Sequence, residues 1–182
     1  GNLRHEMEAM GGVYAGSIPE VNADELQAWK DGIIKKQRGG VASLLKSNKC
    51  GHLAGDARLT GPNSLEVTTS GGETQTVEFE HLILATGARV IEIPGFPFSE
   101  ERIGYAKDAV AYNPIPKRLV VIGGGVIGSE LSMAYRKMGS EVTIVEMLDS
   151  VLPGTDKDLL RPIQKSMRKA GITVLTKAKA KG

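Results

Sequence analysis

The spacing of apolar residues first predicts one long helix near the start of the chain. Residues at helical spacing between Asn22 and Asn48 are Leu26, Trp29, Ile33, Val41, Leu44 and Leu45. Asn22 followed by Glu25 has the residue types of an N-cap with a capping-box partner. Gly39 and Gly40 favour a kink or a close contact in its middle, because each glycine costs about 1 kcal/mol relative to alanine in a helix.

The period then changes from helical to alternating. Leu65 and Val67 alternate with polar residues, Ser70–Glu73 supplies turn residues, and Val77 and Phe79 resume the alternation. This pattern predicts a half-exposed sheet rich in hairpins.

A continuous apolar run, His81–Ala85, ends abruptly at Thr86 and Gly87. Such a run is typical of a buried strand whose C-terminal edge meets a ligand or another backbone. A connector rich in proline and glycine follows, and we place a domain boundary near Pro114.

The segment from Lys117 to Glu146 has the order strand, glycine turn, helix, strand. The packing side of the predicted helix consists of Val126, Ile127, Leu131, Ala134, Tyr135 and Met138, and Gly139 is its expected end. A further helix, capped by Thr155 and Asp158, precedes a strand at residues 172–175; Pro162 should kink this helix or delay its start. These elements predict an α/β fold of the doubly wound, Rossmann-like class.

The glycine turn itself predicts a dinucleotide site. Gly123 permits a tight turn, Gly125 allows a pyrophosphate to approach the backbone, and Gly128 allows close packing of helix and strand. The spacing alone is weak evidence, because 23 of 182 residues are glycine, but the strand and helix around it strengthen the prediction. Glu146 could accept hydrogen bonds from ribose hydroxyls and would repel a 2′-phosphate, which favours NAD over NADP. The alternative is an ordinary exposed glutamate at a strand end.

Composition changes this picture little. The chain is 41% hydrophobic and 24% charged, and its net charge of +2 gives no reason to expect nucleic acid or a membrane surface as a partner. Without an apolar stretch of the roughly 20 residues that span a bilayer, or a signal peptide, we expect a cytoplasmic location. A single cysteine, Cys50, and scattered histidines predict neither a disulfide nor a metal site.

Several motifs in order resemble the FAD- and NAD-dependent pyridine nucleotide-disulfide oxidoreductases. They are Ala85–Ala88, the proline-rich connector, Gly123–Glu130, Val145–Glu146, Leu152–Pro153 and Asp156. The resemblance covers nearly the whole chain, including the long helix and a strand over residues 48–57, and is strongest to the branch that oxidises protein-bound dihydrolipoamide. It implies that residues 1–114 are part of an FAD-binding domain and residues 115–182 the N-terminal part of an NAD-binding domain.

The resemblance also implies cofactor contacts. Ala57 resembles the residue whose backbone meets the adenine of FAD, and Thr86, Gly87 and Ala88 resemble the turn that passes close to the same cofactor. The residues similar to the NAD site are Gly123, Gly124, Gly125, Val126, Ile127, Gly128 and Glu146. Glu130 resembles a glutamate near the meeting point of nicotinamide and flavin, although it could simply pair with a lysine of its helix. Ala88, where many members have serine, and Tyr105–Lys107 depart from the family pattern.

In that family, electrons pass between dihydrolipoamide, a redox-active cysteine pair, FAD and NAD. The cysteine pair, the first FAD fingerprint and the proton-relay histidine and glutamate are not in this sequence, so we expect no catalytic residue here and an inactive chain when it is alone. The resemblance implies a homodimer and a lipoyl-bearing acyltransferase of a 2-oxo acid dehydrogenase complex as partner. An NADH oxidase, a transhydrogenase and a non-catalytic dinucleotide-binding module remain alternatives.

Overall fold

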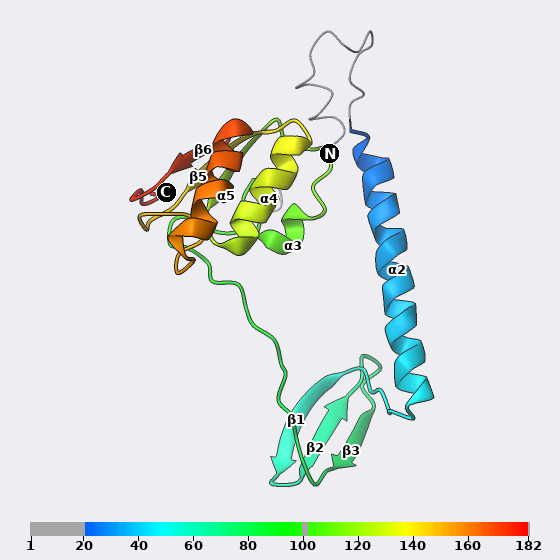
Figure 1. Cartoon of the computed structure of the whole chain (residues 1–182). Helices are drawn as coiled ribbons and strands as arrows, with labels where there is room; N and C mark the ends of the chain where they lie inside the picture. The colour runs from blue at the N-terminus through cyan, green and yellow to red at the C-terminus, as the bar shows by residue number, and fades with distance from the viewer. Residues whose placement is uncertain (1–20, 100–101, 182) are drawn as a thin grey trace. The chain divides into compact units, whose positions relative to one another are not determined.

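The computed structural model describes residues 21–99 and 102–181 (Figure 1). By their internal contacts these residues form two compact units, of which one is Trp29–Arg89 and the other contains the described residues up to Ala28 and from Val90 onward. The elements are α2 (Ala23–Ser47), β1 (Asp56–Gly61), β2 (Ser64–Thr68), β3 (Thr74–Glu78), α3 (Ala106–Ala109), β4 (Arg118–Ile122), α4 (Val126–Lys137), β5 (Glu141–Val145), α5 (Lys157–Lys169) and β6 (Thr173–Leu175).

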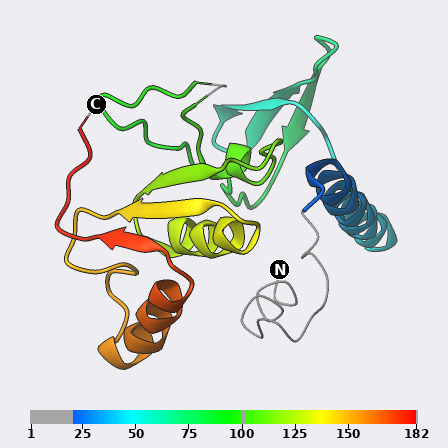
Figure 2. The same cartoon turned by 90° about the horizontal axis from the view of Figure 1, so that it is seen from above.

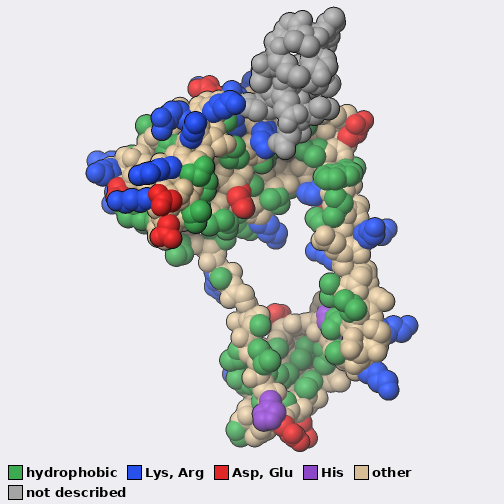
Figure 3. Space-filling model, in the orientation of Figure 1, with side chains coloured by type: hydrophobic (Ala, Val, Ile, Leu, Met, Phe, Trp, Pro, Cys, Tyr) green, Lys and Arg blue, Asp and Glu red, His purple; other side chains and the backbone are tan. Residues whose placement is uncertain are grey.

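Helix α2 agrees with the predicted long helix. The side-chain oxygen of Asn22 accepts a 3.2 Å hydrogen bond from the backbone N–H of Glu25, so the predicted N-cap is confirmed. The helix continues without interruption through Gly39 and Gly40, and a Cβ added at either glycine would have no neighbour within 4 Å. The close contact expected there is therefore absent from the described residues. The apolar face of the helix is exposed, with hydrophobic side chains visible along it (Figure 3).

The predicted hairpin region is confirmed as an antiparallel sheet in the order β1-β2-β3. Asp56 pairs with Thr68, and Ser64 pairs with Glu78. The first strand begins at Asp56, so most of the strand expected over residues 48–57 is irregular. Val67 is the buried side chain of this sheet, at 6% exposure.

The prediction of a buried strand at His81–Ala85 is wrong: these residues are exposed and irregular. These residues belong to no described strand, and Ile83 is 89% exposed. A buried parallel strand requires neighbouring strands on its edges and helices on its faces. None of the described strands pairs with this segment, so its apolar side chains have no sheet to pack into among the described residues.

Strands β4, β5 and β6 form a parallel sheet in that order. Helices α4 and α5 supply the two crossovers and lie on the same face of the sheet (Figure 2). This arrangement is the βαβαβ half of a doubly wound sheet, which confirms the predicted fold class.

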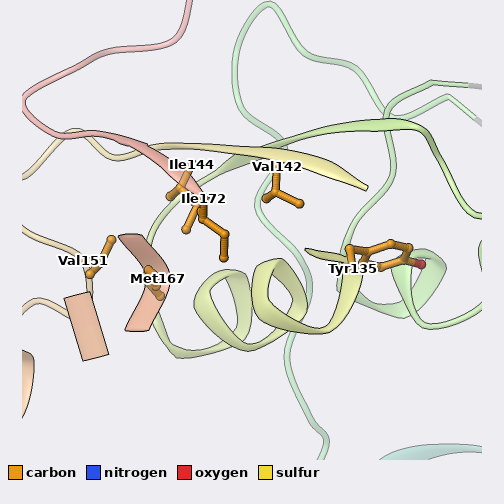
Figure 4. Packing of buried hydrophobic residues seen from close by; sticks show 6 residues of the cluster. All are labelled: Tyr135, Val142, Ile144, Val151, Met167 and Ile172. Atoms are coloured by element: carbon orange, nitrogen blue, oxygen red, sulfur yellow. The ribbon is translucent and has the colours of Figure 1, made fainter. Parts of the chain in front are cut away.

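A small core joins this sheet to its two helices (Figure 4). Its buried side chains are Tyr135, Val142, Ile144, Val151, Met167 and Ile172. Ile144, in the central strand, has 0% exposure. Burying a side chain of this type contributes about 1.5–3 kcal/mol, so the cluster accounts for the order of the sheet and for the fixed position of the loops at its edge.

The ends of the two helices explain how they are held. Gly139 follows α4 with a φ of 106°, so the predicted glycine stop is confirmed. Arg136 donates from Nε to the carbonyl of Ala170, at 2.6 Å, and thereby caps the end of α5. The N-cap of α5 is Asp156 rather than the predicted Thr155 or Asp158. Pro162 lies inside the helix, where it removes one backbone N–H donor.

Candidate functional site

The loops that follow β4, β5 and β6 meet at the carboxyl edge of the parallel sheet. The N–H of Gly123 donates to the carbonyl of Val145 at 2.9 Å, and the N–H of Glu146 donates to that of Leu175 at 2.8 Å. These bonds continue the ladder beyond the strand ends, so the three loops begin at fixed positions. In open α/β sheets, ligands bind at this edge.

The three motif glycines have different surroundings. Gly123 has a φ of 101°, a conformation that side chains with a Cβ disfavour. A Cβ at Gly128 would overlap the carbonyl oxygen of Gly123 and lie 3.1 Å from Cγ1 of Val121. A Cβ at Gly125 would meet no atom within 4 Å. The first and third glycines are thus required by the fold, whereas the second faces open space.

Gly125 also begins helix α4. It is the N-cap residue, no side chain caps the helix, and the first turn contains no acidic residue. The first helical hydrogen bond runs from the N–H of Ser129 to the carbonyl of Gly125, at 2.9 Å. The N–H groups of Val126 and Ile127, which precede it, have no acceptor among the described residues. Such free N–H groups at the positive end of a helix dipole form a ready site for an anion.

Glu146 lies directly after β5 with 7% of its surface exposed, so the alternative of an exposed strand-end glutamate is wrong. Its Oε2 accepts a 2.6 Å hydrogen bond from the N–H of Gly124. Its Oε1 accepts a 2.8 Å bond from the N–H of Leu148. Because each carboxylate oxygen can accept more than one hydrogen bond, capacity remains for the hydroxyls of a ligand.

Three contacts of Gly124 were not foreseen from the sequence. Its carbonyl accepts bonds from Oγ of Ser129, at 3.1 Å, and from the N–H of Leu152, at 2.7 Å. A Cβ at Gly124 would lie 2.8 Å from Cγ1 of the buried Val151. The only sequence signal was a small polar residue, Ser129, within the first turn after the glycines; the contacts from residues 151 and 152 depend on tertiary structure.

The other residues predicted for the dinucleotide site are exposed on α4. Val126 and Ile127 are 62% and 60% exposed, so the prediction that they belong to the packing side of the helix is wrong. Glu130 is also exposed, in the second turn of the helix. Their side chains are therefore accessible next to the glycine loop but do not contribute to the core.

The residues predicted to contact a flavin lie in the unit Trp29–Arg89. Ala57 is exposed in β1 opposite Val67, and Thr86, Gly87 and Ala88 are exposed without regular structure. Gly87 has a φ of 77°, which favours glycine at that turn. In the described part of this unit, no hydrogen bond joins Ala57 to residues 86–88.

Two tyrosines pack against each other away from the glycine loop: Tyr135 lies in the last turn of α4, and Tyr112 precedes β4. The hydroxyl of Tyr135 donates to the carbonyl of Ala109, and the rings of Tyr112 and Tyr135 are 6.1 Å apart. Burial raises the pKa of Tyr135 above 10.0, and the nearby charge of Tyr112 raises it further. The pKa of Tyr112 is also raised, first by burial and then by Asp108. The Tyr135 hydroxyl thus joins α4 to α3 through Ala109, and the ring of Tyr112 packs against that of Tyr135.

The described residues contain neither a membrane-spanning helix nor a cluster of metal-binding side chains. None of the described helices is long and apolar enough to cross a membrane. Within residues 21–99 and 102–181, no group of three or more His, Cys, Asp or Glu side chains could hold a metal ion.

The sequence is similar to that of several proteins named dihydrolipoyl dehydrogenase. The one from Haloferax volcanii is 44% identical over 177 residues, which are 94% of this chain and 36% of that protein. The one from Thermus scotoductus is 40% identical over 178 residues, 98% of this chain and 38% of that protein. The chain therefore spans little more than a third of the length of these curated relatives.

A solved structure and a family model also match this chain. The crystal structure of LpdA from Mycobacterium tuberculosis superimposes with a TM-score of 0.84 at 25% identity, covering 98% of this chain and 40% of that one. The family model described as pyridine nucleotide-disulphide oxidoreductase matches residues 4–182. The match of a family model to almost the entire chain identifies this protein as a member of the pyridine nucleotide-disulphide oxidoreductase family.

Proposed function

We propose that the glycine loop and Glu146 bind NAD in an intact enzyme of which this chain is the central part. The observation that carries the proposal is the open space beside Gly125, which the uncapped N–H groups of α4 follow and whose preceding residue, Gly124, is bonded to the Glu146 carboxylate. A dinucleotide diphosphate has the charge and the acceptor atoms that this surface lacks, so the residues present fit the cofactor.

The roles of the individual groups follow from this fit. The N–H groups of Gly125, Val126 and Ile127 donate to the diphosphate, and Gly125 leaves room for it. Glu146 accepts from the ribose hydroxyls with the lone pairs that Gly124 and Leu148 do not use. Its negative charge repels a 2′-phosphate, which makes NAD the preferred nucleotide over NADP. Gly123 and Gly128 hold the loop without touching the ligand.

A second part of the proposal concerns FAD. Ala57 contributes backbone atoms to the adenine site, and the turn Thr86–Ala88 lies along the flavin cofactor in the intact protein. The exposed backbone at these positions and the positive φ of Gly87 support this assignment. Residues 1–114 then belong to an FAD-binding domain and residues 115–182 to an NAD-binding domain, with Glu130 near the place where nicotinamide and flavin meet.

The activity of the intact protein is that of a dihydrolipoyl dehydrogenase. Protein-bound dihydrolipoamide loses two electrons and two protons to become lipoamide, and NAD+ gains a hydride to become NADH with release of one proton. FAD supplies the two-electron carrier between the two substrates. Identities of 44% and 40% to proteins of that name support this activity. The cytoplasmic homodimer would take its substrate from the lipoyl-bearing acyltransferase of a 2-oxo acid dehydrogenase complex.

The test is a steady-state assay on the intact, flavin-loaded protein that contains this chain. We expect dihydrolipoamide to reduce NAD+ at a rate at least tenfold above that with NADP+, because Glu146 disfavours the 2′-phosphate; each tenfold corresponds to about 1.4 kcal/mol. NADH oxidation by oxygen should be slow in comparison. Fast consumption of oxygen without turnover of dihydrolipoamide would instead assign the protein to the oxidase branch.

A further inference from the structure

Gly124 lies between the first two motif glycines, at a position that the dinucleotide motif leaves open to any residue. In this protein its N–H bonds to Oε2 of Glu146, and its carbonyl accepts from Ser129 and Leu152. We infer that Gly124, Ser129 and Glu146 form a clasp that positions the phosphate-binding loop, so that Glu146 governs diphosphate binding as well as ribose binding. This inference rests on the proposed NAD site.

The clasp connects two loops that come from different strands. One carboxylate oxygen of Glu146 holds the loop after β4 through Gly124, and the other holds its own loop through Leu148. The N–H of Leu152 returns to the carbonyl of Gly124 and closes the connection. All these bonds join protein atoms to one another, so the clasp uses no atom of the nucleotide.

Packing leaves no room for a side chain at position 124. Gly124 is buried, and a Cβ there would lie 2.8 Å from Cγ1 of Val151 and 3.3 Å from Oε2 of Glu146. Val151 has 1% exposure and belongs to the core, so it cannot move aside cheaply. Displacement of Gly124 would therefore disturb both the core and the carboxylate.

The bonding of Gly124 also determines which backbone N–H groups of the loop remain for a diphosphate. Its N–H is already used by Glu146, so the diphosphate must take the N–H groups that follow, from Gly125 to Ile127. A glutamine at position 146 could accept through only one of its two terminal atoms, and its NH2 group would face an N–H donor. The amide variant therefore breaks the clasp although it keeps the size of the side chain.

The experiment separates positioning from ribose contact by comparing two probes, ADP and 2′,3′-dideoxy-ADP. The second probe carries the diphosphate but lacks the ribose hydroxyls that Glu146 would bind. Their dissociation constants are measured by titration calorimetry on the flavin-loaded intact protein, for the wild type and for Glu146→Gln. Glu141→Gln is the matched control, because Glu141 is exposed at the start of the same strand.

We expect Glu146→Gln to weaken dideoxy-ADP about tenfold relative to the wild type, because one buried hydrogen bond to a charged group is lost. Glu141→Gln should bind both probes as the wild type does. If Glu146→Gln binds dideoxy-ADP with wild-type affinity and loses only ADP affinity, the carboxylate contacts ribose alone and the clasp is refuted.

Ser129→Ala provides a second test that does not alter the charge and that keeps the result decisive if Glu146→Gln does not fold. It removes the hydroxyl that donates to the Gly124 carbonyl, and we expect about threefold weaker binding of both probes with an unchanged ratio between them. Wild-type affinity for both probes in this variant would overturn the clasp. Failure of the wild type itself to bind ADP would overturn the NAD site, and the clasp with it.

Discussion

Gly128→Ala should lower mainly the stability of the protein and Gly125→Ala mainly its affinity for NAD, although each substitution adds one methyl group to the same loop. At Gly128 the new Cβ overlaps the carbonyl oxygen of Gly123, and this backbone atom can move only if the turn opens. We therefore expect Gly128→Ala to destabilise the nucleotide-free protein by about 1–3 kcal/mol or more, as overpacked cores do. At Gly125 the Cβ meets nothing, and the φ of −66° suits alanine. The change of N-cap residue costs about 0.5–1 kcal/mol at most.

For NAD affinity, Gly125→Ala should be the more damaging of the two substitutions. The Cβ of Gly125→Ala would occupy the space through which the diphosphate approaches, and we expect NAD affinity to fall about a hundredfold, the equivalent of losing two charged hydrogen bonds. Thermal unfolding of the nucleotide-free protein gives the first quantity, and titration calorimetry with NAD+ gives the second. A Gly125→Ala variant that unfolds at the wild-type temperature and binds NAD+ normally would refute the assignment of the open face of Gly125 to the cofactor.

Three further predictions concern other parts of the chain. Arg136→Ala should lower the free energy of unfolding by about 1.5–3 kcal/mol, because a charged donor to the carbonyl of Ala170 is lost, and Arg136→Lys should not restore it; chemical denaturation checks both. Burial raises the pKa of Tyr135 and of Tyr112 in the folded protein, so the unfolded chain releases these protons first as pH rises. The free energy of unfolding should therefore be unaffected by the ionisation of these groups below pH 10.0 and should fall as pH rises through the raised pKa values. A pH series of unfolding temperatures should show this fall, and the fall should be smaller in Tyr135→Phe. In the intact protein, Gly87→Val should lower bound flavin measured by absorbance, and full retention would show that this turn is not at the cofactor.

The features that could be predicted from sequence are those set by local spacing. The N-cap at Asn22 and the glycine stop at Gly139 follow from residues a few positions apart, and the alternation of strand and helix after Lys117 follows from the apolar spacing within each element. The same is true of the tight turn at Gly123, where the backbone has a positive φ. These elements could be found because their chemistry is complete within one helix or one βαβ unit.

The features that sequence could not supply depend on contacts between distant segments. The apolar run His81–Ala85 has the composition of a buried strand, but composition does not provide a neighbouring strand. The burial of Glu146 by Gly124 and the approach of Val151 arise only when two loops meet at the sheet edge. The predicted caps of α5, Thr155 and Asp158, lie one and two residues from the observed N-cap Asp156, because all three are acceptable cap residues.

The most direct test of the NAD site is a crystal structure of the intact protein with NAD+ bound. We expect the diphosphate oxygens about 3 Å from the N–H groups of Gly125 to Ile127, and the ribose hydroxyls at hydrogen-bond distance from Glu146, whose bond to Gly124 persists. A diphosphate bound away from the N-terminus of α4, or a ribose that does not reach Glu146, would contradict the account.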